Sequence, residues 1–348
     1  KDGEGLGIYN GLPLWGGERV SMRIAANSQT NKPLDFATNA KDYLYVSSIS
    51  NVIAENQREA FTLNLVPREA ITNETTRVSG KYPTDSPIDV SVRKIIKDYL
   101  KTDKPVNVDE SSNTYGFIGN LKRPFNVLVW LASKAVPKRQ DSSAGFLFYQ
   151  TQEGFNFRSI DSLISSEPVA SYVYTDVVKN PTEQNNDFNI LQYSIDRNQN
   201  LLEKLRLGAY ASFRAAFNPV DGTFTLPQKG LFTQKDYKTK NLGQELKLPS
   251  IANNANQTLG DLPSRIITQV FDIGTMEKGV SVKPNADPFQ YQSQAVMRYN
   301  LLFTQTVQMT VPLNTNLKAG DVIECDFPKV SRSEKPEYDD EQSGLYMI

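Results

Sequence analysis

The sequence predicts an α+β fold that is mainly β, on three observations. Alternating polar and apolar residues indicate strands near both ends of the chain, at residues 19–24 and 321–327. Two helical segments with one apolar face lie between these ends, at residues 86–100 and 124–136. Residues 218–262 are rich in Asn, Gln, Gly, Pro and Lys, which is typical of exposed loops or an insertion.

The first part of the chain, residues 1–80, is expected to be a β unit. Apolar side chains alternate with polar ones over residues 19–24, as in a half-buried strand. Residues 43–46 and 61–65 are short aliphatic and aromatic runs separated by polar stretches that suit turns. An antiparallel sheet or barrel is the simplest arrangement of these strands.

Residues 81–165 are expected to form an α+β unit. A capping Ser86 followed by Pro predicts a helix start, and the second helix should end before Pro137. The aromatic runs at residues 146–149 and 155–158 flank a Gly-containing turn and predict a hairpin. The phenylalanines of these runs alternate with other residues, which favours core packing over the stacking of a sugar or nucleobase.

The second half of the chain returns to β structure. We expect strands at residues 188–193, 210–217, 265–272, 306–311 and 321–327, and helices at residues 200–207 and 287–303. Gly208 supplies the stop for the shorter helix.

Composition restricts the chemistry available to this chain. There is no histidine, so Ser-His and Cys-His nucleophiles are excluded. The single Cys325 cannot form an intramolecular disulfide or a zinc site, and its alternating strand predicts a small core residue. The net charge of −1 argues against nucleic acid as a sequence-specific ligand. No apolar run approaches the roughly 20 residues of a membrane-spanning helix, so we expect no membrane insertion.

No residue is assigned a catalytic, cofactor-binding or metal-binding role. The acidic runs Asp109-Glu110 and Asp339-Asp340-Glu341 are more typical of solvated loops than of an acid–base pair or a calcium site. Lys134 belongs to a small positive cluster expected to complement a helix C-terminus.

Interface residues are predicted on general grounds. Aromatic residues and Arg are enriched at protein interfaces, which points to Trp15 and Arg158 together with residues 218–262.

Several motifs carry a resemblance to a known family. Residues 125–162 contain a Pro-Phe-Asn opening, a Trp-Leu-Ala helix and the aromatic hairpin; Arg-Tyr-Asn-Leu follows at residues 298–301, and Asn-Leu-Lys-Ala-Gly-Asp-Val-Ile at residues 316–323. With these motifs in this order, the chain resembles the central baseplate hub proteins of contractile-tailed bacteriophages. This is the family of the gene 27 product of T-even phages, and it is related to the hub part of type VI secretion spike proteins.

The resemblance implies two tail-tube-like β-barrel domains around an α+β domain. The first barrel would comprise residues 1–80, and the second residues 166–217 and 295–348. Residues 81–165 would be the α+β domain and residues 218–294 a loop-rich insertion. Family hubs are homotrimers that adapt a threefold central spike to a sixfold tail tube.

The resemblance also implies partners and a place in the virion. The expected partners are the central spike protein, a tail tube or tube-initiator protein, the tape measure protein and baseplate wedge proteins, with DNA only in transit during genome ejection. The expected location is the tail baseplate, assembled in the host cytoplasm, and no cofactor is expected. The start at Lys1 rather than Met leads us to expect further residues upstream, and the family pattern predicts a further turn and strand after Ile348.

Other functions remain as alternatives. The chain could instead be a receptor-binding adhesin that contacts a glycan through residues 218–262, or another tube or wedge component of the baseplate. An enzyme alternative is a carboxylate-dependent cell-wall hydrolase, for which Glu153 and Asp340 are the residues to test.

Overall fold

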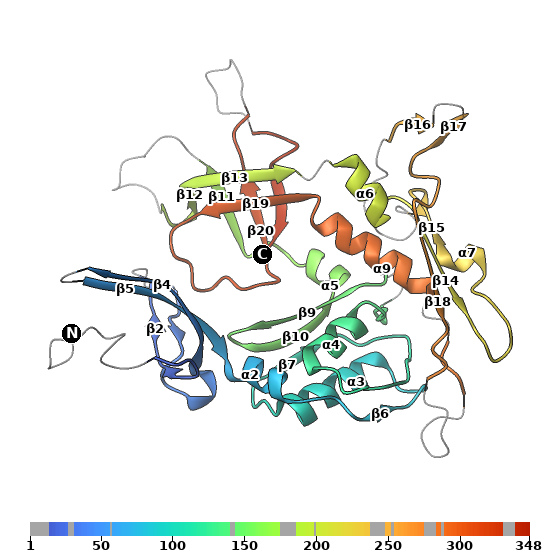
Figure 1. Cartoon of the computed structure of the whole chain (residues 1–348). Helices are drawn as coiled ribbons and strands as arrows, with labels where there is room; N and C mark the ends of the chain where they lie inside the picture. Colours follow the sequence, from blue (N-terminus) through green and yellow to red (C-terminus); the bar gives the residue numbers. More distant parts are fainter. Residues whose placement is uncertain are drawn as a thin grey trace.

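The computed structural model describes most of the chain, and its architecture is mixed α and β with mostly strands (Figure 1). The described residues are 14–26, 31–55, 58–139, 143–174, 186–197, 200–236, 248–251, 254–274, 283–286, 289–329 and 338–348. The mixture of helices and strands, with strands in the majority, confirms the predicted α+β class. In this part of the chain, no helix is long and apolar enough to cross a membrane.

The N-terminal region is a small antiparallel sheet with a long projecting hairpin. Strands β1 (Arg19–Val20), β4 (Leu44–Glu55) and β5 (Arg58–Pro67) pair in that order, and β2 (Arg23–Ile24) pairs with β3 (Leu34–Asp35). The single strand predicted over residues 19–24 is wrong, because its two halves pair with different partners. The other two predicted strands are confirmed, and both are longer than predicted.

A helix that the sequence did not predict follows the hairpin. Helix α2 (Arg68–Thr75) has no regular apolar stripe, and its buried residues are the polar Glu69 and Asn73. Asn73 accepts a hydrogen bond from the Phe125 backbone N–H at 2.8 Å. The Glu69 carboxylate lies 3.7 Å from the ammonium of Lys104. Polar contacts with residues far along the chain therefore fix this helix to the rest of the molecule, and they take the role that a hydrophobic face usually has.

The centre of the molecule is a three-stranded sheet with two helices on one face. Strands β7 (Val106–Val108), β10 (Gly154–Ser159) and β9 (Phe146–Thr151) pair in that order. Helices α3 (Ile88–Ile95) and α4 (Pro124–Ala132) pack against it, and a π-helical turn, η2 (Ile96–Leu100), continues α3. The core between them includes Val92, Ile95, Leu128, Leu131, Phe146, Phe155 and Phe157. The predicted hairpin and the core role of its phenylalanines are confirmed.

Two helix ends differ from the predictions. The residue before α3 is Pro87, and its N-terminus has no side-chain cap, so Ser86 does not cap this helix. Helix α4 ends at Ala132, where the chain turns through Ser133 rather than continuing toward Pro137. A short pair, β6 (Lys81–Tyr82) with β8 (Phe117–Ile118), flanks this region.

The part of the molecule above the central sheet in Figure 1 contains two facing layers of strands. One layer has the order β12 (Asn189–Ile190), β11 (Ala170–Tyr174), β20 (Val322–Asp326), β21 (Gly344–Met347). The other pairs β13 (Gln192–Arg197) with β19 (Gln305–Thr310). They share a core that contains Tyr172, Ile190, Ile323, Cys325 and Phe327. The core role predicted for Cys325 is confirmed, whereas the strand predicted over residues 188–193 is split.

Short connecting helices join these regions. Helix α5 (Ile160–Ile164) follows β10 and is capped by Ser159, which accepts a hydrogen bond from the Ser162 N–H. Helix α6 (Leu201–Leu207) ends at Gly208, whose φ of 72° allows the left-handed stop that the sequence predicts.

The remaining sheet joins a strand just before the expected insertion of residues 218–294 to two strands within it. Strand β14 (Ser212–Phe217) lies between β15 (Leu231–Phe232) and β18 (Arg265–Val270). Helices α7 (Pro227–Gly230) and α9 (Phe289–Leu302) pack against β14. Strands β16 (Ser250–Ile251) and β17 (Asn254–Thr258) form a further pair. Residues 218–262 thus contain short elements as well as the predicted loops.

None of these sheets closes on itself within the described residues. Each sheet has a first and a last strand with one unpaired edge. The two barrel domains therefore stay a prediction, and so do the domain boundaries. The open edges are the feature of the fold that matters most for assembly.

Candidate assembly surfaces

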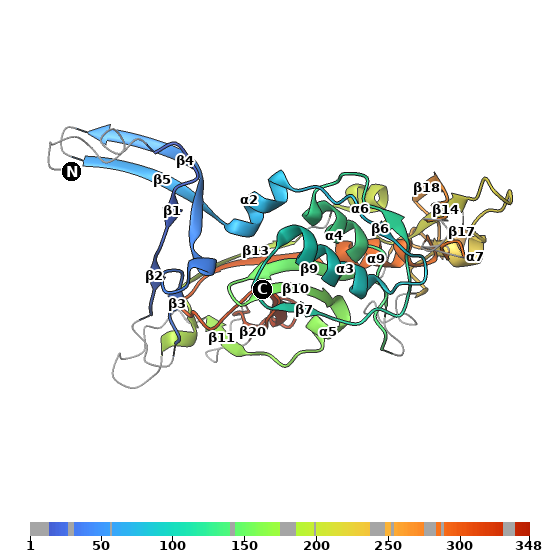
Figure 2. The ribbon, with the colours of Figure 1, turned by 90° about the horizontal axis from the view of Figure 1, so that it is seen from below.

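The hairpin of β4 and β5 forms a two-stranded ribbon, which we call the ribbon, that projects from the rest of the molecule (Figures 1 and 2). Among the described strands, β1 pairs with β4 at Leu44 and Tyr45, the Val46 backbone is also hydrogen-bonded to Gly17 and Glu18, and β5 is an edge strand. An isolated two-stranded hairpin is marginally stable in water. The ribbon therefore presents unpaired backbone groups that another strand can complete.

The shaft of the ribbon carries no charged residue. Residues 44–54 and 60–67 contain only apolar and neutral polar side chains, and charges occur only around the tip. Val52 and Ile53 are 42% and 59% exposed. Exposed edge strands of free-standing proteins usually carry charges or Pro that prevent edge-to-edge pairing. Apart from Pro67 at its base, the shaft lacks such residues and has the character of a buried interface.

A large apolar cavity, which we call the groove, lies at the end of α9 between β19 and β21. Its volume is 1010 Å³. Its lining includes Leu147, Ile164, Leu301, Phe303, Val307, Met309, Ile323, Leu345, Met347 and Ile348. Among the described lining residues, only Glu341 is charged, and it pairs with Arg197 at 3.0 Å. Among the described strands, β19 pairs only with β13 and β21 only with β20, so each presents a free edge.

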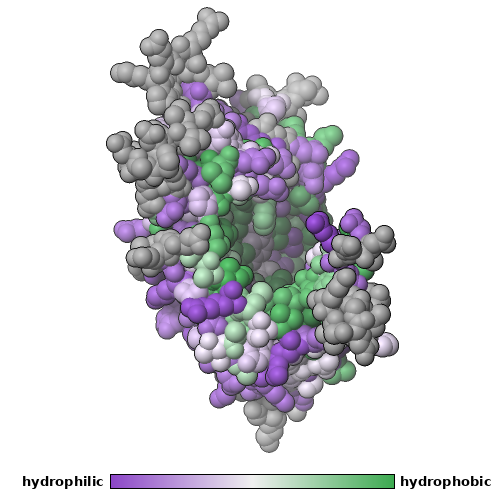
Figure 3. Space-filling model, turned by 90° about the vertical axis from the view of Figure 1, so that its left-hand side faces the viewer, coloured by the Kyte–Doolittle hydropathy of each residue, from purple (hydrophilic) through white to green (hydrophobic). Residues whose placement is uncertain are grey.

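The apolar lining of the groove is accessible. Phe303 and Leu345 are 65% and 60% exposed. The face shown in Figure 3 is hollowed, and hydrophobic residues border the hollow. Exposed apolar surface of this kind marks interaction sites on folded proteins.

The predicted interface residues lie on different parts of the molecule. Trp15 precedes β1 and is 87% exposed, and its backbone N–H donates to the Glu18 carboxylate at 2.6 Å. Arg158 lies on β10, and its Nε is 2.9 Å from Asp109 Oδ1. The exposed ring of Trp15 is available for a partner, whereas Arg158 is engaged within its own chain. Their interface role stays a prediction.

The acidic pair beside Arg158 has local structural partners. Asp109 accepts hydrogen bonds from the Ser159 N–H at 2.9 Å and the Ser162 hydroxyl at 2.6 Å. Glu110 pairs with Lys138 at 2.8 Å. In the described residues, no group of three or more Cys, Asp or Glu side chains is placed to hold a metal ion.

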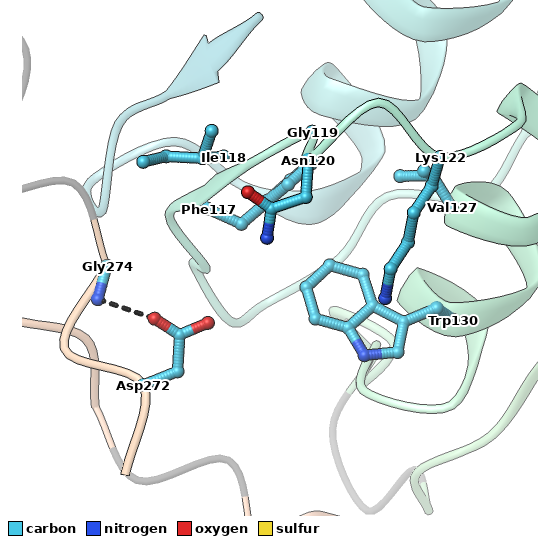
Figure 4. A pocket seen from close by; sticks show the side chains of 9 residues that line it. All are labelled: Phe117, Ile118, Gly119, Asn120, Lys122, Val127, Trp130, Asp272 and Gly274. Carbon is cyan, nitrogen blue, oxygen red and sulfur yellow. Dashed lines mark hydrogen bonds between the residues drawn. The ribbon is translucent and has the colours of Figure 1, made fainter. Parts of the chain in front are cut away.

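A second, smaller cavity joins the central core to the segment after β18 (Figure 4). It has a volume of 250 Å³ and is lined by Phe117, Ile118, Gly119, Asn120, Lys122, Val127, Trp130, Asp272 and Gly274. The side chains of Asn120 and Asp272 point toward its interior, and the Trp130 ring forms one wall. The Lys122 ammonium lies 5.8 Å from the Trp130 ring centre.

The side chains around this cavity lock two distant segments together. Tyr115 donates a hydrogen bond to Asp272 Oδ2 at 3.1 Å. Buried Asn285 accepts from the Gly116 N–H at 2.7 Å and donates to the Gly116 carbonyl at 2.8 Å and the Asp272 carbonyl at 3.1 Å. Sequence analysis missed this cluster, because its members are far apart in the chain and form no local motif. We call this cluster of Tyr115, Gly116, Asp272 and Asn285 the clamp, because hydrogen bonds among its members hold the two segments together.

Lys134 is buried beside this clamp, contrary to its predicted place in a surface cluster. Its ammonium lies 4.8 Å from the centre of the Tyr115 ring and 4.9 Å from that of Trp130. Burial lowers the pKa of Lys134 to about 8; nearby Asp272 opposes this shift and Arg214 adds to it. Helix α4 ends before this residue, and the Lys134 ammonium lies over two aromatic rings.

Comparison with known proteins finds partial structural likeness and no match in sequence. No protein-family model matches the chain, and no curated protein matches its sequence. Among solved structures, the fold is similar to the tail protein from Neisseria meningitidis MC58, with a TM-score of 0.44 at 10% identity over 81% of this chain and 69% of that one. It is also similar to the 43 kDa tail protein of prophage MuSo2 from Shewanella oneidensis, with a TM-score of 0.41 at 9% identity over 88% and 78%.

Proposed function

We propose that this chain is a structural protein of a phage or phage-like contractile tail, and more specifically a homotrimeric baseplate hub. The sequence motifs at residues 125–162 and 298–323 support this family assignment. In this role the hub adapts the threefold central spike to the sixfold tail tube and forms part of the conduit for the tape measure and DNA.

One structural observation carries the proposal of an assembly role. The same chain presents a projecting ribbon with an uncharged shaft and a mostly apolar groove, whose described lining contains one charged residue. Among the described strands, both surfaces have free strand edges. Surfaces of this composition are buried in assembled proteins. Because the two surfaces differ, a contact between them would be head-to-tail, and such contacts build rings when the rotation closes.

The polar features of the chain fit a scaffold as well. The acidic residues around Arg158 and the clamp residues at Asp272 and Asn285 are held by structural partners. The Cys325 thiol is buried, and burial raises its pKa to about 11. These groups contribute to rigidity, which a ring under mechanical load requires.

Electron cryo-microscopy of the purified chain at high concentration tests the hub directly. We expect class averages of a closed ring with threefold symmetry, built from two similar units per chain. Sixfold rings of single units would favour a tube protein, and particles of one chain under all conditions would contradict the hub. The preparation needs no other tail protein, so the result reports on this chain alone.

A further inference from the structure

We propose that the ribbon of one copy docks in the groove of a second copy, with a strand of the ribbon paired to the free edge of β19 or β21. This inference rests on the proposed function, because it names the contact that would join the copies of the ring. The ribbon comprises β4 and β5, and the groove is the cavity between β19 and β21.

The two surfaces match in chemistry. The ribbon shaft offers aliphatic and aromatic residues between Ser, Thr and Asn, and its charges lie only around the tip. The groove offers Leu, Ile, Met, Val and Phe between Gln, Thr and Ser, and Glu341, the one charged residue among its described lining, already pairs with Arg197. Contact between them would bury apolar area without leaving a charge unpaired, which is the composition of a stable interface core.

The two surfaces also match in backbone geometry. The groove is bordered by two strand edges whose backbone groups have no strand partner among the described residues. In the same part of the chain, the ribbon beyond Val46 is a pair of strands whose outer edges pair with no other strand. Pairing such edges satisfies backbone donors and acceptors that water would otherwise have to solvate. A two-stranded ribbon gains stability when a third strand joins it.

The ribbon belongs to a different copy because its base is fixed within its own chain. The Thr315 hydroxyl donates to the Lys32 carbonyl at 2.6 Å, which ties the N-terminal sheet to the loop after β19. The buried Glu69–Lys104 pair holds the helix that follows the ribbon. Figures 1 and 2 both show the ribbon directed away from the body that carries the groove. The contact is therefore between unlike surfaces of two copies, an arrangement that forms a ring when the rotation from copy to copy closes.

Disulfide trapping between two differently tagged full-length chains tests this contact. One chain carries Ile53→Cys in the ribbon, and the other carries Leu345→Cys in the groove; both positions are exposed in the single copy. We expect mild oxidation to give a covalent pair that contains one chain of each kind and that a reductant separates. The matched control replaces Leu345→Cys by Val270→Cys, an equally exposed position on β18, and should give no such pair.

A charge placed on the ribbon gives an independent test. Because Ile53 is exposed in the single copy, Ile53→Glu should leave the fold intact while burying an unpaired carboxylate in the contact. We expect the concentration of half-assembly to rise at least about tenfold, whereas Val270→Glu should leave it unchanged.

The outcomes separate this inference from the proposed function. Multimers that form without the mixed disulfide, and that tolerate Ile53→Glu, would overturn the docking while leaving the hub intact. A single-chain mass at all concentrations would overturn the hub and the docking together. A mixed disulfide that appears only after another tail protein is added would show that the partner, rather than a second copy alone, completes the groove, and would overturn the contact as stated.

Discussion

The ammonium of Lys134 lies 4.8 Å from the centre of the Tyr115 ring, and the hydroxyl of that ring donates a hydrogen bond to Asp272. These contacts connect the end of α4 to the segment that follows β18. They show that the central core and the expected insertion are joined by a polar and aromatic cluster as well as by apolar packing.

Lys134 makes the stability of the protein depend on pH. Burial lowers its folded-state pKa to about 8, below the ordinary value of 10.5, so the unfolded chain binds the proton more tightly between these two values. The contribution of Lys134 to the free energy of unfolding should therefore rise by about 2 kcal/mol between pH 7.5 and 9.5. Denaturant unfolding of the wild-type chain and of Lys134→Met, each at pH 7.5 and at pH 9.5, measures this contribution. The difference between the two proteins should change with pH, and an unchanged difference would contradict the assignment.

Asn285 should be essential for the clamp. Replacing it by Ala leaves the Gly116 N–H and two carbonyl groups without their side-chain partner in a buried site. We expect Asn285→Ala to lower the free energy of unfolding by about 2 to 3 kcal/mol. The control is Asn126→Ala on the exposed face of α4, which should change it by less than about 0.5 kcal/mol. Equal effects of the two variants would show that the clamp adds no stability.

Gly154 is required by the turn of the central hairpin. Its φ is +145°, and a Cβ at this position would lie 2.1 Å from the Pro105 carbonyl oxygen. Gly154→Ala should destabilise the fold by about 3 kcal/mol, because backbone strain and a clash with main chain act together. Gly222→Ala, which meets strain at φ +72° without any atom within 4 Å, should cost only about 1 kcal/mol. Thermal unfolding of both variants distinguishes the clash from the strain.

Cys325 should react slowly with thiol reagents in the folded protein. Its side chain is buried in the core between the two upper sheets, and burial raises its pKa to about 11, so the thiolate is scarce at pH 8. Ellman's reagent should label the chain at pH 8 only after denaturant is added. Rapid labelling without denaturant would contradict the burial of this residue.

Local sequence patterns correctly predicted the elements for which the spacing of apolar side chains and the position of a turn or stop glycine indicate the same structure. The aromatic hairpin around Gly154 and the helix that ends at Gly208 both follow from short-range rules. Helix α2 was missed because its buried residues, Glu69 and Asn73, are polar and depend on Lys104 and Phe125, which lie far along the chain.

The candidate surfaces were predictable only in part. The absence of charge from residues 44–54 and 60–67 is visible in the sequence, but that these strands project as a ribbon is a tertiary property. The groove requires β19 and β21 to have free edges, which no local pattern reports. Arg158 shows that residue type alone can mislead. Arginine is common at interfaces, but the Nε of Arg158 lies 2.9 Å from Asp109 of the same chain.

The mass of the full-length chain in solution, measured by light scattering over a range of concentrations, tests the central claim most directly. Three copies, with a mass three times the 39.0 kDa of one chain, are the predicted result. If the chain has the mass of a single copy at every concentration, and Ile53→Glu in the ribbon leaves that mass unchanged, the account of this protein as a ring-forming hub is contradicted.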